Sequence, residues 1–99
     1  MRLTEHQKIN IKRLAKEEFG QAAIVMVFGS RAHDAKKGGD LDLLVVTDDP
    51  LTNPALQAAR FGSRVERLMN GRKVDVLIKA PSLKEQPIHV IAQNTGVQL

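Results

Sequence analysis

Cysteine, tryptophan and tyrosine are absent from this chain of 99 residues, and each absence excludes a kind of chemistry. Without cysteine there are no disulfides, no thiolate nucleophile and no cysteine-bound zinc, which fits a reducing compartment. Phenylalanine supplies all three aromatic residues, so the stacking platforms that single-stranded nucleic acid usually needs are scarce. We therefore expect a cytoplasmic protein and do not favour nucleic acid as its partner.

Long apolar segments are missing as well. The longest apolar stretches, 22–28 and 41–46, are far shorter than the roughly 20 residues of a membrane-spanning helix, and the charged amino terminus does not resemble a signal peptide. No membrane association is expected. A chain of this length has material for one core, so we expect a single domain over 1–99. The net charge of +4 indicates an anionic partner, which leaves nucleotide, nucleic acid and acidic protein surfaces open.

The pattern of apolar residues predicts a mixed order of helices and strands. Helical spacing between capping residues and Gly or Pro stops predicts the helices, and continuous or alternating apolar runs predict the strands. The expected elements are a helix over 4–19, a strand over 23–28, a short helical turn within 31–39, a strand over 40–47, a helix over 54–69, a strand over 73–79 and a last helix from 86 to before 96. This order argues for an α+β fold, one small mixed sheet covered by helices.

Three acidic residues carry the predicted chemistry. Asp40 and Asp42 stand two apart at the start of a strand, so both carboxylates leave one face while Leu41 and Leu43 point into the core. Two like charges held this close are unfavourable unless one is protonated or a cation lies between them, and hard oxygen ligands suit Mg²⁺. Asp75 is a third carboxylate in an otherwise apolar strand. If that strand lies beside the one carrying Asp42, the three acids can hold two metal ions about 3.5 to 4 Å apart, the arrangement used for in-line phosphoryl transfer.

A phosphate-binding bend is expected directly after the first strand. Gly29 and Ser30 end that strand and open a helical turn, where free N–H groups and a small side chain can receive phosphate oxygens. Arg31 follows at once, and its guanidinium pairs well with phosphate. These three residues are the predicted nucleotide-binding group.

The segment VFGSRAHDAKKGGDLDLLVV, followed later by VDVLI, resembles the DNA polymerase beta-like nucleotidyltransferase superfamily, most closely its minimal branch (MNT). The resemblance extends over nearly the whole chain from the first strand onward and implies the nucleotidyltransferase fold. It also implies that Gly29 and Ser30 hold the triphosphate, that Asp40 and Asp42 bind the metal, and that Asp75 assists or activates the attacking hydroxyl. The two glycines before Asp40 depart from relatives that often carry a serine or another polar residue there.

The same resemblance implies a Mg²⁺-dependent enzyme that moves a nucleoside monophosphate, AMP from ATP, onto a hydroxyl acceptor. Larger relatives carry an added helical domain for base and acceptor, so for a single small domain we expect a partner protein or a homodimer to complete the site. Relatives of this kind pair with small helical HEPN-type proteins in prokaryotic toxin–antitoxin systems. Three functions stay open: modification of such a partner, non-catalytic masking of it, and modification of a small compound such as an aminoglycoside.

Basic residues recur at helical spacing in both long helices. Arg60, Arg64 and Arg67 form one stripe, for which a solvated face is a more ordinary interpretation than a docking surface for an acidic partner or RNA. The first helix presents the same choice, with Glu17 and Glu18 nearby to neutralise its cations. Those cations are Lys8, Lys12, Arg13 and Lys16.

Overall fold

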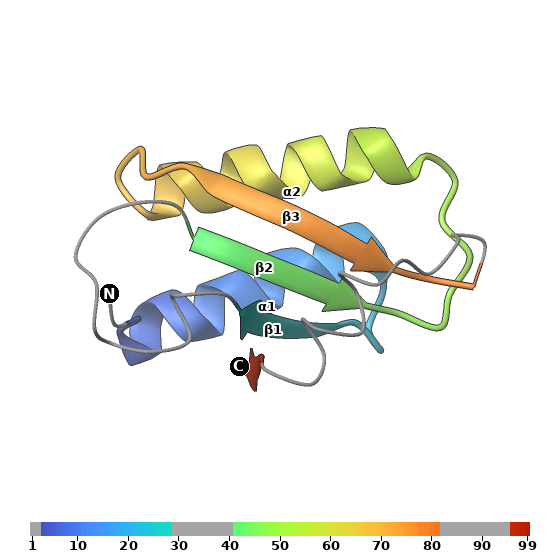
Figure 1. Cartoon of the computed structure of the whole chain (residues 1–99), viewed down its shortest axis with the longest axis horizontal. Helices are drawn as coiled ribbons and strands as arrows, with labels where there is room; N and C mark the ends of the chain where they lie inside the picture. Colours follow the sequence, from blue (N-terminus) through green and yellow to red (C-terminus); the bar gives the residue numbers. More distant parts are fainter. Residues whose placement is uncertain (1–2, 29–40, 82–95) are drawn as a thin grey trace.

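The structure is a computed structural model that describes residues 3–28, 41–81 and 96–99. In this part of the chain two helices cover one face of a four-stranded sheet (Figure 1). The elements are α1 (Glu5–Phe19), β1 (Ile24–Phe28), β2 (Leu41–Val46), α2 (Pro54–Leu68), β3 (Val74–Lys79) and β4 (Val97–Gln98). The predicted turn within 31–39 and the predicted last helix lie outside the described residues.

The sheet has the strand order β3-β2-β1-β4 and mixes both directions of pairing. β1 is antiparallel to β2 and to β4, whereas β2 and β3 are parallel. A parallel pair needs a crossover, and α2 provides it. The predicted α+β fold with a small mixed sheet covered by helices is confirmed. The two-residue strand β4, beside β1 at one edge, was not predicted.

Both helices begin where the sequence places capping residues. At the start of α1, the Thr4 hydroxyl accepts the Gln7 N–H at 3.0 Å and the Gln7 side chain accepts the Thr4 N–H at 2.9 Å, which completes a capping box. Asn53 accepts a backbone N–H of the first turn of α2 at 3.2 Å. After α2 the chain reverses through Asn70 and Gly71, which have φ values of 60° and 86°. Both residue types tolerate this left-handed conformation, so the turn delivers the chain to β3 without strain.

The core lies between the helices and the sheet. Leu41, Leu43 and Val45 of β2 point into it by the two-residue period of a strand, and all three are buried. Phe61 of α2 meets Phe19 of α1 edge to face, with ring centroids 5.4 Å apart, so an aromatic contact joins the two helices. No helix in the described ranges is long and apolar enough to cross a membrane.

Candidate active site

Asp42 of β2 and Asp75 of β3 occupy matching positions on two parallel strands. Leu41 and Leu43, on either side of Asp42, are buried against the helices, and so is Val74. Because side chains alternate along a strand, both aspartates leave the opposite face of the sheet. Asp42 is half-buried and Asp75 is exposed. The expected adjacency of these two strands is confirmed, and it brings the two carboxylates together.

The end of β1 lies at the same end of the sheet. Phe28, the last residue of β1, is the register partner of Asp42, so Phe28, Asp42 and Asp75 form one row across three strands. The chain therefore leaves β1 at the acidic end of the sheet and not at the far end. The other predicted site residues, Asp40 among them, lie outside the described part of the chain; they include Gly29, Ser30 and Arg31.

The donor chemistry of this row fits a hard divalent cation. Among the described residues, no three His, Cys, Asp or Glu side chains come together as a metal site. Asp42 and Asp75 alone provide two carboxylates on one face, one of them open to solvent. Mg²⁺ binds through one or two carboxylates and keeps several waters, so two such groups beside solvent suit it. The third predicted ligand, Asp40, is outside the described residues.

A hollow of about 360 Å³ lies beside Asp75, between the edge strand β3 and α2. Ser63 and Glu66 of α2 line it together with Asp75 and its neighbour Val76. The carboxylate of Glu66 accepts the backbone N–H of Val74 at 3.2 Å. This bond fixes the start of β3 one residue before Asp75. Sequence reasoning missed Glu66, and no local signal distinguishes it from any other helical glutamate.

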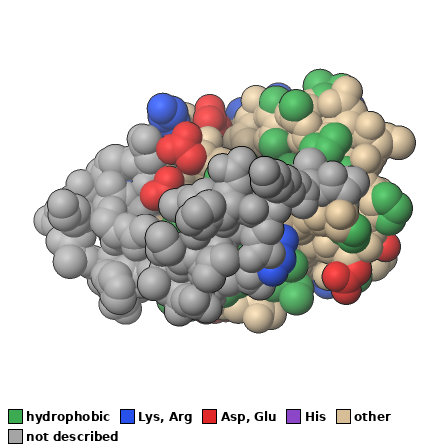
Figure 2. Space-filling view, turned by 45° about the vertical axis from the view of Figure 1, so that its right-hand side comes forward, with side chains coloured by type: hydrophobic (Ala, Val, Ile, Leu, Met, Phe, Trp, Pro, Cys, Tyr) green, Lys and Arg blue, Asp and Glu red, His purple; other side chains and the backbone are tan. Residues whose placement is uncertain are grey.

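Acidic residues of α1 neutralise most of the predicted arginine stripe on α2. Glu18 pairs with Arg60 at 2.8 Å, and Glu17 pairs with Arg64 at 3.0 Å and with Arg13 at 2.8 Å. Hydrogen bonds from Arg13 and then Arg64 hold the pKa of the Glu17 carboxyl below its ordinary value. Two of the three arginines are therefore paired, and all three line one hollow together with Glu18. Figure 2 shows acidic side chains gathered at the upper left of one face of the molecule, with a basic group beside them.

The profile of a family described as "Nucleotidyltransferase domain" matches residues 8–95. The match covers most of the chain, so this protein belongs to the nucleotidyltransferase domain family. The resemblance drawn from its motifs is thereby confirmed. A comparison with curated proteins found no match.

Solved structures with a similar fold include toxin–antitoxin complexes. The tri-AMPylated Shewanella oneidensis HEPN toxin in complex with MNT antitoxin contains a chain with a TM-score of 0.69 and 16% identity; the alignment covers 97% of this chain and 71% of that one. A toxin–antitoxin structure with AMP-PNP gives 0.71 and 17%, with coverages of 96% and 72%. The MntA-HepT toxin–antitoxin gives 0.67 and 16%, with coverages of 96% and 70%. At such identities the likeness establishes the shared fold, which is the fold predicted from the sequence.

Proposed function

We propose that the chain is an antitoxin that transfers AMP from ATP to a hydroxyl group on a small helical HEPN-type partner protein. Family membership supports nucleotidyl transfer, and the printed descriptions of the similar structures, with an AMPylated HEPN toxin and a bound ATP analogue, support this donor and this acceptor. The single observation that carries the proposal is the register that sets Asp42 opposite Asp75. A toxin–antitoxin role in the cytoplasm, with one domain over 1–99, belongs to the same proposal.

The acids divide the chemistry between them. Asp40, Asp42 and Asp75 would hold Mg²⁺, which when bound supplies neutralisation of phosphate charge and orientation of the triphosphate. Asp75, being exposed, is accessible to an acceptor hydroxyl and takes its proton as the oxygen attacks the α-phosphorus. A new P–O bond to the acceptor forms, the bond to pyrophosphate breaks, and pyrophosphate leaves with the bonding electrons.

Gly29, Ser30 and Arg31 form the proposed binding site for the triphosphate. They follow β1 directly in the chain, and β1 ends in the row that holds Asp42. Backbone N–H groups and a serine hydroxyl donate hydrogen bonds to phosphate oxygens, and a guanidinium pairs with them by charge. Catalysis is then mostly positioning and charge stabilisation.

The experiment is an AMP-transfer assay in which the product of the gene next to that of this chain is tested as the HEPN-type partner. The purified chain, this protein and Mg²⁺ are incubated with ATP labelled at the α-phosphate, and we expect the label to become covalently attached to the HEPN-type protein. Asp42→Asn should slow labelling at least about 100-fold, because loss of one electrostatic contact to the transition state commonly has effects of this size. Asp48→Asn is the matched control, since Asp48 is exposed beyond the other end of β2.

Two outcomes would contradict the proposal. If no NTP labels the partner, transfer to a protein is wrong. If Asp42→Asn abolishes labelling but still neutralises the toxicity of the partner, neutralisation works by masking and the AMP transfer is not its cause.

A further inference from the structure

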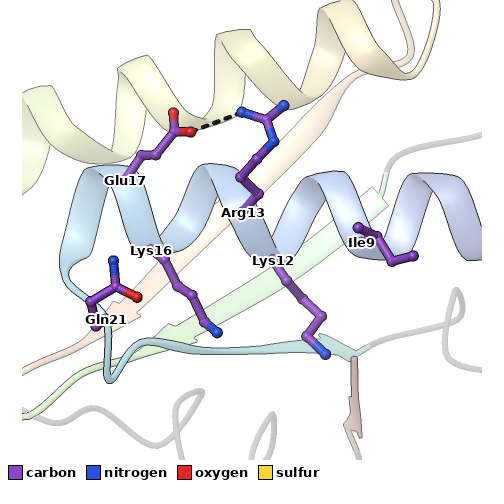
Figure 3. A pocket seen from close by; sticks show the side chains of 6 residues that line it. All are labelled: Ile9, Lys12, Arg13, Lys16, Glu17 and Gln21. Atoms are coloured by element: carbon purple, nitrogen blue, oxygen red, sulfur yellow. Dashed lines mark hydrogen bonds and ion pairs between the residues drawn. The ribbon is translucent and has the colours of Figure 1, made fainter.

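Lys12 and Lys16 are cations of α1 that have no ion pair within the described residues. Their neighbour Arg13 is held by Glu17, which also pairs with α2. Figure 3 shows the two lysines leaving α1 on the side away from Arg13 and Glu17, with both amino groups pointing the same way. The positive charge of α1 that its acidic residues do not neutralise is therefore concentrated on one side of the helix.

An exposed apolar side chain accompanies these lysines. Ile9 stands one turn before Lys12, is 62% exposed, and lines the same hollow of about 420 Å³ as both lysines and Gln21. A lone exposed isoleucine needs no explanation. An apolar side chain framed by charges that face solvent, however, has the composition of a protein interface, which combines apolar contact with a polar rim.

We infer that an acidic region of the partner protein docks on the surface formed by Ile9, Lys12 and Lys16, which we call the α1 surface. The occupant is a surface on which carboxylates one helical turn apart flank an apolar side chain, so that the acids meet the lysines and the apolar group meets Ile9. Charge complementarity is the basis, because two unpaired ammonium groups attract carboxylates, speed encounter and disfavour basic partners. The inference rests on the proposed function in one respect, namely that the partner is the acceptor protein.

The composition of the α1 surface favours protein over RNA. Nucleic acid binding depends on neutralising many phosphates at once, and this surface offers only two lysines without an ion pair in the described part of the chain, while the hollow that they line also includes the Glu17 carboxylate. No aromatic side chain lines it for base stacking. An apolar side chain such as Ile9 contributes nothing to phosphate binding, whereas it can pack against an apolar side chain of a protein.

The α1 surface is separate from the candidate active site. α1 packs on the helical face of the sheet, and Asp42 and Asp75 leave the other face. A partner held at α1 must therefore present its acceptor hydroxyl from a different segment. Changes at the lysines should raise the KM for the partner and leave kcat at saturating partner unaltered.

The test measures the affinity of the full-length chain for the same HEPN-type protein at constant, low ionic strength. Lys16→Glu should weaken binding roughly three- to ten-fold and Lys12→Glu with Lys16→Glu by about ten- to thirty-fold, because each reversal removes an attraction and adds a repulsion. Arg67→Glu is the matched control, an equal charge change at an exposed position of α2, and should leave the affinity within about two-fold. Circular dichroism checks that all variants fold.

Several results would overturn the inference. Unchanged affinity in the double variant, or an equal loss with Arg67→Glu, would show that the lysines are not a docking site. If a 12-nucleotide RNA binds the chain and loses its affinity in the lysine variants, the surface serves nucleic acid. Lysine-dependent binding without AMP transfer would sustain the docking surface and defeat the proposed function, and lysine-independent binding with AMP transfer would do the reverse.

Discussion

Replacing Asp75 by Asn should raise the melting temperature of the metal-free protein. The Asp42 carboxylate lies at the matching position of the neighbouring strand, and hydrogen-bonded strands are about 4.8 Å apart. Two unit charges about 5 Å apart in a water-like medium repel by roughly 0.8 kcal/mol, and this medium is appropriate because Asp75 is exposed. For a domain of this size, 1 kcal/mol corresponds to about 4–8 °C, so we expect a rise of about 3–6 °C.

The same substitution should remove stabilisation by Mg²⁺. A ligand that binds only the folded chain, present at ten times its dissociation constant, adds roughly 1.4 kcal/mol, so MgCl₂ should raise the melting temperature of the parent chain by about 6–11 °C. Differential scanning calorimetry in EDTA and in MgCl₂, at matched ionic strength, measures both effects. Asp48→Asn is the control, and should respond to Mg²⁺ as the parent does.

Either of two calorimetric results would refute this reasoning. A lower melting temperature for Asp75→Asn without metal would mean that the carboxylate makes a favourable contact and not a repulsive one. Equal stabilisation of parent and variant by Mg²⁺ would mean that the cation binds elsewhere.

Three further predictions concern packing, strand positioning and pH. Phe61→Ala should lower the free energy of unfolding in urea by about 3–5 kcal/mol, since Phe61 is fully buried; a loss below about 1 kcal/mol would contradict its place in the core. Glu66→Ala should speed hydrogen exchange of the Val74 amide, whereas Glu66→Gln, which keeps an acceptor, should change it less; equal rates in both would exclude the contact. Because the pKa of Glu17 in the folded chain is below its ordinary value of 4.5, the ionised carboxylate stabilises the fold above pH 4.5, and this stabilisation is lost as the pH falls through the folded-state pKa. The NMR titration midpoint of Glu17 should therefore lie below 4.5 and rise in Arg13→Gln.

Local signals made most of the fold predictable. The Thr4–Gln7 box and the Asn53 cap mark helix starts through contacts only three residues long, and the structure shows those contacts. Strand periods identified the buried face of each predicted strand. By contrast, β4 spans only Val97 and Gln98, too short for any period to appear, and it exists because β1 offers an edge to pair with.

The candidate site likewise has features that the sequence predicts and features that it does not. Asp42 and Asp75 were found from sequence because carboxylates in apolar strands stand out, and their meeting depended on one condition, the adjacency of β2 and β3. The neutralisation of Arg60 and Arg64 depends on how α1 packs against α2, with pairs more than forty positions apart in the chain. Contacts of that range leave no trace in helical spacing, so the sequence predicts the arginines of the stripe and not the acids that pair with them.

Mn²⁺, a paramagnetic substitute for Mg²⁺, tests the shared metal site most directly. Small amounts are added to the ¹⁵N-labelled chain with AMP-PNP, and the broadening of each amide signal is followed by NMR. We predict that signals of β2 and β3 around Asp42 and Asp75 broaden first and that Asp42→Asn abolishes the effect. Broadening centred on another part of the chain, such as the acidic turn at Asp48 and Asp49, would contradict the account.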